Sequence, residues 1–344
     1  MVVGNSTFVI AGQEVRPGCN KTVELQIPEL YTHTPMVMPV HVVHGKKPGP
    51  VVFISGALHG DELTGTAVIR RLMQNKLLGQ IRGTLLLVPI VNMYGFIHQS
   101  RYLPDRRDLN RCFPGSESGS LAARLAKLFM DEIVSLSSHG IDLHSGAIHR
   151  TNLPQIRANL EHPESRDMAM AFGAPVVLHS GLRDGSLRQA VDELGIPVIL
   201  YEAGEALRLD EYSLRTGVKG IIEVLRSLSV IAPSRRRSIK AKNSFVALSS
   251  SWLRSQNSGM VFLTVALGDY VEDGETLGEI VDPLSERSTP IVSHQAGIVI
   301  GRSQIPLTNE GDALVHVAEA QAGIVAEELA DLVSPLSSDG DIFP

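Results

Sequence analysis

Two stretches of the chain hold residues that could bind a metal ion. In the stretch 53–65, His59 and Glu62 directly follow an apolar segment and are surrounded by glycines. Residues three positions apart lie on one side of a helix, so these two side chains can face one point if a helix begins there. Catalytic zinc is usually held by three histidine or carboxylate ligands. His144, in the stretch 140–146, is the natural candidate for a third ligand from a distant segment.

Polar clusters recur along the chain where strands are expected to end. An H-x-x-E pair alone is weak evidence, because most histidines in strands are structural. Here four such clusters occur, at 59–62, 100–111, 142–146 and 201–204. If their strands belong to one sheet, the clusters meet at the edge where ligands of α/β sheets bind. Gly56, Gly60 and Gly65 are expected to let the backbone bend tightly around the metal.

The segments between these clusters alternate between strand and helix patterns. Apolar, β-branched runs predict strands at 40–43, 50–57, 83–92, 140–146, 174–180 and 196–204. Apolar residues at helical spacing predict helices at 64–78, 121–136, 165–173, 186–195 and 212–228. This alternation is typical of an α/β fold, with a mostly parallel or mixed sheet that has helices on both faces. The stretch 149–157 is expected to be a loop that lines the pocket, with no role assigned to Asn152 or Arg157.

The pattern changes in the C-terminal third. Residues 1–232 are predicted to form the domain that carries the metal site, and 233–243 a basic, Ser-containing linker. Residues 244–330 consist of short apolar runs separated by Gly-Asp, Asp-Gly and Asn-Glu-Gly turns, which predicts a small all-β module. It resembles the barrel-sandwich of biotinyl and lipoyl carrier domains, but the turn between its halves has no lysine to modify. We therefore expect a structural or oligomerising module, followed by a disordered tail at 331–344.

Composition excludes several classes of protein. The chain has 344 residues, of which 43% are hydrophobic and 20% charged, so it can bury a large core. A formal net charge of -6 argues against nucleic acid as the main partner. Two cysteines cannot form a disulfide framework or a cysteine zinc site. Without a signal segment or a long apolar run, a cytoplasmic protein that does not enter the membrane is expected. The assembly is left open, with a small homo-oligomer as the working expectation.

Four motifs together resemble the succinylglutamate desuccinylase/aspartoacylase family, which is related to zinc carboxypeptidases of the M14 kind. They occur in the order GALHGDELTG, RDLNRCFPG, DLHSG and YEAG, between about residues 50 and 205. A parallel sheet followed by a β-rich module is also similar to that family. The resemblance implies that His59, Glu62 and His144 hold one zinc ion per chain, the same set that the residues alone favour. Asp142, two residues before His144, is expected to orient that histidine.

The catalytic roles follow from the chemistry of a zinc-bound water and from the same resemblance. A base must take a proton from the water and hand it to the leaving amine. Glu202, at the end of an apolar strand, suits this role and matches the catalytic glutamate of the family; Glu205 is a rival whose simpler interpretation is an exposed loop carboxylate. Arg101 lies where the family has an arginine that stabilises the oxyanion, in competition with Arg106 and Arg107.

Substrate binding is assigned to three residues. Asn110 and Arg111 would grip a carboxylate of the substrate, because the planar guanidinium meets a carboxylate bidentately. The alternative is that Asp108 and Arg111 only tie down their loop. Arg188 would meet a second acidic group, or else it is an ordinary arginine on a helix surface.

Three functions fit these residues. The leading one is a zinc-dependent deacylase, an amidohydrolase that cleaves the amide bond of an N-acyl amino acid or a similar small amide bearing a carboxylate. The second is a metallocarboxypeptidase that trims the C-terminal tail of a peptide or protein, which an open rim would favour. The third is a non-catalytic zinc- or carboxylate-binding protein, which would predict a defective set of site residues. None of the positions named above is missing, and the sequence identifies neither the acyl group nor the amine.

Overall fold

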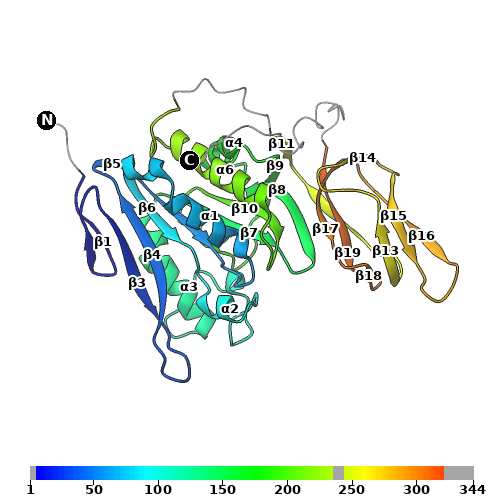
Figure 1. Cartoon of the computed structure of the whole chain (residues 1–344), viewed down its shortest axis with the longest axis horizontal. Helices are drawn as coiled ribbons and strands as arrows, with labels where there is room; N and C mark the ends of the chain where they lie inside the picture. The colour runs from blue at the N-terminus through cyan, green and yellow to red at the C-terminus, as the bar shows by residue number, and fades with distance from the viewer. Residues whose placement is uncertain (1–4, 235–243, 321–344) are drawn as a thin grey trace.

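The structure is a computed structural model that describes residues 5–234 and 244–320 (Figure 1). Its first part contains the strands β1 (Phe8–Ile10), β2 (Gln13–Val15), β3 (Asn20–Ile27), β4 (Met36–His44), β5 (Lys47–Gly56), β6 (Arg82–Val88), β7 (His139–Gly146), β8 (Arg150–Ala158), β9 (Val176–His179) and β10 (Val198–Glu205). Its helices are α1 (Leu63–Met73), α2 (Met93–Ile97), α3 (Leu121–Glu132), α4 (Pro163–Phe172), α5 (Leu187–Asp192) and α6 (Glu211–Ser227), with short 3-10 turns at Lys76–Gln80, Leu109–Arg111 and Val134–Leu136. The predicted helix at 64–78 is therefore a shorter α1 followed by a separate turn, which Asn75 caps.

The second part is built from strands alone within residues 244–320. They are β11 (Phe245–Ala247), β12 (Ser250–Arg254), β13 (Gly259–Leu263), β14 (Tyr270–Val271), β15 (Thr276–Val281), β16 (Ser288–Val292), β17 (Gly297–Ser303), β18 (Leu307–Thr308) and β19 (Ala313–Glu319). Figure 1 shows these C-terminal strands beside the α/β part, at the right-hand end of the molecule.

The central element is a mixed sheet of 13 strands with the order β12-β19-β17-β8-β10-β7-β5-β6-β4-β3 along its main path. The pairs β6-β5, β5-β7 and β7-β10 at its centre are parallel, whereas β4 runs antiparallel to β6 and β8 antiparallel to β10. The strands are buried on both faces because helices cover both. One core cluster joins the sheet to α1, α4 and α6, and a second joins its other face to α3 and α5. The predicted α/β class with helices on both faces is confirmed.

Strand β8 was not expected, because the sequence 149–157 is polar and contains Pro154. Its register against β10 explains how a proline fits there. Asn152 lies opposite Gly204 and Gln155 opposite Glu202, so β8 has one extra residue across this interval. Pro154 falls within the irregular stretch, where a strand tolerates a residue without an N–H donor. The loop prediction is therefore wrong, and its residues belong to the central sheet.

The C-terminal strands continue this sheet through β17, which pairs antiparallel with β8. A second sheet of four strands, β16-β15-β13-β18, packs over them around a small apolar core that includes Leu253, Val261 and Val299. The predicted all-β character is confirmed, and the module shares a sheet with the α/β part. The domain boundaries at 232 and 244 stay predictions. Most of the linker at 233–243 and the whole tail at 331–344 lie outside the described residues. No helix within 5–234 or 244–320 has the length and apolar character needed to cross a bilayer.

Candidate active site

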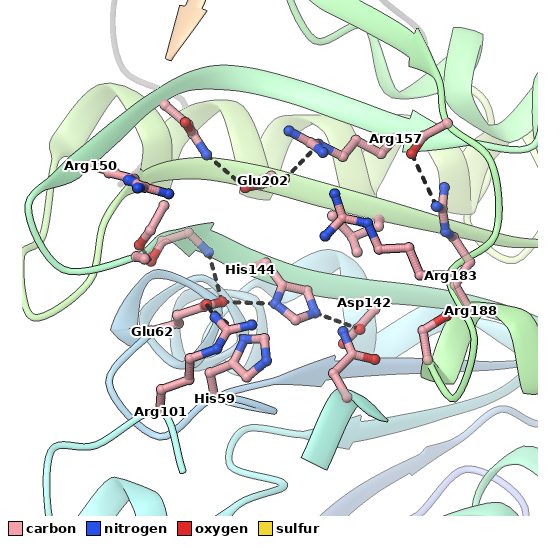
Figure 2. Close-up of a pocket in the computed structure, with 18 of the residues that line it drawn as sticks. His59, Glu62, Arg101, Asp142, His144, Arg150, Arg157, Arg183, Arg188 and Glu202 are labelled. Atoms are coloured by element: carbon pink, nitrogen blue, oxygen red, sulfur yellow. Dashed lines mark hydrogen bonds and ion pairs between the residues drawn. The ribbon is translucent and has the colours of Figure 1, made fainter. Parts of the chain in front are cut away.

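The turn between β5 and α1 brings His59 and Glu62 together. Glu62 is the N-cap residue of α1, directly before its first residue Leu63, and its backbone N–H donates to the carbonyl of His59 at 3.1 Å. The His59 Nδ1 atom lies 2.7 Å from Oε1 of Glu62, and Nδ1 of His144, on β7, lies 2.8 Å from Oε2. Figure 2 shows the Glu62 carboxylate facing His144, with His59 beside them. The predicted helix start after the turn is confirmed, and it puts all three side chains in one buried cluster.

The glycines of this turn act through close packing. None of Gly56, Gly60 and Gly65 is among the glycines of positive φ. A Cβ atom on Gly60 would lie 1.9 Å from the carbonyl carbon of Gly95 in α2, and one on Gly65 would lie 2.9 Å from the Leu143 side chain. A tight bend around the metal stays a prediction, and the glycines do not adopt a left-handed conformation there. The close contacts show that they let α1 and α2 approach the strands that carry the ligands.

Carboxylates hold the far nitrogen of each imidazole. The Nε2 atom of His144 lies 2.8 Å from Asp142, which also accepts a hydrogen bond from the Ser55 hydroxyl at 2.7 Å. The Nε2 atom of His59 lies 3.0 Å from Asp108. Histidines that bind a metal through one nitrogen usually donate the other N–H to such a group, which fixes the ring. Asp142 thus lies beside His144, as the sequence predicted. The contact of Asp108 with His59 was not predicted, although Asp108 belongs to the DLNR motif.

The charge of this cluster fits a divalent cation. His59, Glu62, Asp108, Asp142, His144 and Arg101 form what we call the ligand half of the pocket. With both histidines neutral, as metal ligands must be, its three carboxylates face one guanidinium, which leaves two negative charges in excess. Burial works against charge on His144, but Asp142 and Glu62 raise its pKa well above the usual value. In the same way, burial works against charge on Glu62, yet His59 and His144 hold the pKa of Glu62 well below its usual range.

The donor geometry points the same way. One ligand atom each from His59, Glu62 and His144 lie within 4.8 Å of one another, and all three residues are buried. Two imidazole nitrogens and one carboxylate are a ligand set that zinc takes in catalytic sites. The residues present therefore fit a zinc ion, held by the Nδ1 atoms and the Glu62 carboxylate.

Glu202 lies beside this cluster on β10. It is in register with His144 on the parallel neighbour β7, so both side chains project from the same face of the sheet. Glu202 lies toward the end of an apolar strand, as expected, but its carboxylate has two polar partners. Asn152 Nδ2 donates to Oε1 at 2.7 Å, and Nε of Arg157 pairs with Oε2 at 2.6 Å. Both partners come from β8, the strand that the sequence did not predict.

One cavity of about 430 Å³ joins the ligand cluster to Glu202. Among the predicted residues that line it are Arg101, Asn110, Arg111 and Arg188. Arg101 donates to Asp108 at 3.0 Å and to Glu62 at 3.3 Å, so it reaches the ligands.

The residues predicted as rivals do not line this cavity. Arg106 and Arg107 are exposed, and Arg107 pairs with Asp105. Glu205 accepts from the backbone of His149 and pairs with Arg208. Of the three candidate arginines, only Arg101 reaches the pocket.

The remainder of the pocket is strongly basic. Five arginines line it, which together we call the arginine half: Arg111, Arg150, Arg157, Arg183 and Arg188. Figure 2 shows Arg150 at the opposite end of the pocket from Arg183 and Arg188, with Glu202 between them.

Arg188 is the most buried of these arginines. Its side chain lies on α5 and donates to the Ser180 hydroxyl at 3.1 Å and to the Gly181 carbonyl at 2.7 Å. Its Nη1 atom is buried without a hydrogen-bond partner among the described residues. Burial, together with the charges of Arg157 and Arg183, lowers the pKa of Arg188 to about 10. Arg188 lies on a helix, as predicted. Its side chain is buried at the pocket and is not exposed to solvent on the outer face of that helix.

Two pocket residues had no signal in the sequence: Arg183, in the loop before α5, and Trp252, from β12 of the C-terminal part. Arg150, which begins β8, lies in the stretch 149–157 that was expected to line the pocket, but no role was assigned to it. Trp252 packs between the Arg150 guanidinium, at 5.3 Å from its ring centroid, and the His316 ring at 4.5 Å. Strand β12 reaches the pocket because it follows β19 and β17 in the sheet, and β17 pairs with β8; no local pattern encodes that pairing.

The chain matches a family model over residues 48–228, which contain the ligand half and the arginine half of the pocket but not Trp252. The model describes the succinylglutamate desuccinylase/aspartoacylase catalytic domain. The chain belongs to this family. The resemblance seen in the four motifs is thereby confirmed, and both enzymes in the family name remove an acyl group.

A curated relative supports the same class of reaction. The N-alpha-acetyl-L-2,4-diaminobutyric acid deacetylase of Halomonas elongata is 26% identical over 295 residues, which cover 83% of this chain and 86% of the relative. Together with the family, this relative supports deacylation, the hydrolysis of an amide, as the class of reaction.

Solved structures of the family share the fold. A succinylglutamate desuccinylase/aspartoacylase from Rhodobacter sphaeroides is 24% identical, with a TM-score of 0.77 over 88% of this chain and 96% of its own. The product-bound ectoine utilization protein EutE (DoeB) from Ruegeria pomeroyi is 23% identical, with a TM-score of 0.79 over 88% of this chain and 95% of its own. At these identities the likeness supports the arrangement of strands and helices alone.

Proposed function

We propose that this protein is a zinc-dependent deacylase that hydrolyses the amide bond of an N-acyl amino acid whose amine half carries a second acidic group. The observation that carries the proposal is the position of Glu202. It lies in register with His144, so a carboxylate stands next to a buried ligand set within one small cavity. A cavity of about 430 Å³ is of the size that encloses a small molecule.

The metal ion and the base Glu202 have separate roles in the proposed reaction. A zinc ion held by His59, Glu62 and His144 would supply a Lewis acid and a water of lowered pKa. Glu202 takes a proton from the attacking water and delivers it to the nitrogen of the leaving amine. Arg101 donates to the carbonyl oxygen as negative charge develops there, since its guanidinium already reaches the Glu62 carboxylate.

The arginine half binds the amino-acid part of the substrate. Asn110 and Arg111 hold its α-carboxylate; the Asn110 side chain is fixed because its Oδ1 accepts from the backbone N–H of Leu187 at 2.9 Å. Arg188, one residue further along α5, meets the second acidic group with its unpartnered Nη1. A carboxylate there would offset the repulsion among Arg157, Arg183 and Arg188.

Small substrates fit this pocket better than a polypeptide tail. Trp252, from the C-terminal strands, lines the cavity and packs on Arg150, so the rim is narrowed on that side. This supports the deacylase over the peptide-trimming alternative. A cytoplasmic location and a homo-oligomeric assembly remain part of the proposal, and neither bears on the chemistry.

Metal analysis and turnover test the proposal together. The purified protein should hold about one zinc ion per chain, and His144→Ala should lose it. Glu202→Gln should keep the metal and lose about 100-fold or more in kcat, the size expected for a general base. Undiminished turnover by Glu202→Gln would contradict the mechanism, and metal retained by His144→Ala would contradict the ligand set.

A substrate panel tests the acidic preference. N-acetylaspartate and N-succinylglutamate should be hydrolysed with higher kcat/KM than N-acetylalanine, because each brings a second acidic group to Arg188. N-alpha-acetyl-2,4-diaminobutyrate, the substrate in the name of the curated relative, places an ammonium there and should be the poorest of the four. A preference for the diaminobutyrate compound would overturn the acidic class while leaving the deacylase mechanism intact.

A further inference from the structure

The base proposed above is held from one strand at both of its oxygens. Asn152 Nδ2 donates to Oε1 of Glu202 at 2.7 Å, and Arg157 pairs with Oε2 at 2.6 Å (Figure 2). A carboxylate accepts about four hydrogen bonds, so each oxygen keeps a free position for water. The side chains of Glu202 and Asn152 therefore form a fixed unit at the edge of the cavity, which both residues line.

The two contacts differ in what they contribute. Arg157 brings a positive charge and forms an ion pair with the carboxylate. Asn152 is neutral, so its hydrogen bond acts mainly on the direction in which the carboxylate points. Asn152 is itself buried, with 5% of its surface exposed, and its amide has little freedom to turn. What fixes the amide lies behind it, on strand β17.

Gly301 of β17 is directly opposite Asn152 in the antiparallel ladder. A Cβ atom on Gly301 would lie 2.7 Å from Oδ1 of Asn152, closer than such atoms pack. The next neighbours of that position, His316 Cβ at 3.2 Å and Trp252 at 3.5 Å, leave little space to move into. Oδ1 thus packs against the bare backbone of Gly301, and Nδ2 is turned toward Glu202.

We propose that Asn152 is a positioning residue for Glu202, and that Gly301 of the C-terminal strands sets the direction of the Asn152 side chain. The inference rests on the proposed role of Glu202 as the base. If Gly301 acts in this way, the C-terminal strands affect the rate of the reaction in addition to narrowing the pocket. An alanine at 301 displaces the flexible end of Asn152 and breaks its hydrogen bond to Glu202, while the ligands of the metal stay in place.

A double-mutant cycle on kcat tests this chain of contacts. Gly301→Ala should lower kcat by about 10- to 100-fold, the size of a displacement of a reacting group, and change KM by less than about twofold. Asn152→Ala should lower kcat by a similar factor. Because the methyl group acts through Oδ1, the double variant should be no slower than Asn152→Ala alone. Zinc content should equal that of the wild type in all three.

Two further variants separate positioning from folding. Asn152→Asp keeps the shape of the side chain but replaces the Nδ2 donor with a carboxylate oxygen that repels Glu202, so kcat should fall at least as far as in Asn152→Ala. Gly259→Ala is the matched control: its Cβ would lie 2.6 Å from the Val281 carbonyl, in the sheet of the C-terminal part that does not line the pocket. It should lower the melting temperature and leave kcat unchanged.

The outcomes decide between the two proposals. Normal kcat in Gly301→Ala, or multiplicative losses in the double variant, would overturn the positioning chain while the deacylase function stands. A loss of kcat in Gly259→Ala equal to that in Gly301→Ala would also overturn it, since instability would then explain both. A wild-type protein that binds zinc but hydrolyses none of the N-acyl amino acids would overturn the proposed function and this inference with it.

Discussion

The ligand half and the arginine half of the pocket differ in whether their charged groups have partners of opposite charge. In the ligand half every ionisable group has a partner of opposite charge or a hydrogen bond: Asp108 and Glu62 both contact Arg101, and Asp142 contacts His144. In the arginine half, Glu202 is the single carboxylate that lines the cavity. Within residues 5–234 and 244–320, Arg150, Arg183 and Arg188 form no ion pair.

The difference separates two kinds of functional group. The ligand half is organised before any substrate arrives, because its carboxylates and imidazoles fix one another. The arginine half holds buried positive charge that a bound anion would stabilise: burial, and after it the charges of Arg157 and Arg183, lowers the pKa of Arg188 to about 10. Perturbed groups of this kind concentrate at functional sites. Substitutions in the ligand half should therefore act on the metal, and substitutions in the arginine half should act on the substrate.

Asp142→Asn gives the largest expected effect and tests the first half of this comparison. It keeps the size of the side chain but removes the charge that holds Nε2 of His144 at 2.8 Å. Zinc affinity should fall by about 10- to 100-fold, since partners that orient a metal-binding histidine have effects of this size. Titration against a competing chelator measures it. Ser55→Ala, which removes only the hydrogen bond to Asp142, is the control and should lose less affinity. Equal affinity in Asp142→Asn and the wild type would contradict the comparison.

Arg188→Gln tests what the comparison says of the arginine half, with an expected change of about tenfold in kcat/KM. A hydrogen bond to a charged group contributes about 1.5 kcal/mol or more, so kcat/KM for N-acetylaspartate should fall by about a factor of ten. N-acetylalanine has no second acidic group and should be nearly unaffected, and zinc content should not change. The control is Arg215→Gln, an exposed arginine of α6 that pairs with Glu211 away from the pocket. Equal losses for both substrates would mean that Arg188 supports the fold of the pocket and does not recognise the side chain.

The sequence predicts the ligand half better than the arginine half for a physical reason. His59, Glu62 and Asp142 follow from strand ends and local spacing, because neighbouring parallel strands align their carboxyl ends. Arg150 and Asn152 depend on β8, whose polar residues and Pro154 hide a central strand from any periodicity argument. The α/β class and the all-β C-terminal part also follow from local sequence patterns. The pairing of β17 with β8 does not follow from such a pattern, because the register between segments about 150 residues apart is set by the packing of the whole sheet.

The smallest expected effect uses His316 as a probe of the arginine half. This residue is 4% exposed on β19 and stacks on Trp252. Burial, with further contributions from Arg157 and Arg183, lowers the pKa of His316 from 6.5 to about 3. Arg183→Gln should therefore raise that pKa by a part of the difference, measured by following the His316 ring signals in an NMR titration. An unchanged value would mean that the charge of Arg183 is not felt beyond the pocket.

The same shift predicts how stability depends on pH. The unfolded chain binds a proton at His316 below pH 6.5, whereas the folded protein does not until about pH 3. The contribution of neutral His316 to the free energy of unfolding is therefore fully present above pH 6.5. It is lost as the pH is lowered from 6.5 toward 3, by up to about 1.4 kcal/mol per pH unit. His316→Gln loses the stacking on Trp252 and should be less stable at pH 8, but its stability should fall less steeply with acid. Denaturant unfolding at pH 8, 6 and 4.5 measures both slopes. Parallel slopes would show that His316 takes up its proton in the folded protein as in the unfolded chain, so that neither burial nor the nearby arginines lower its pKa.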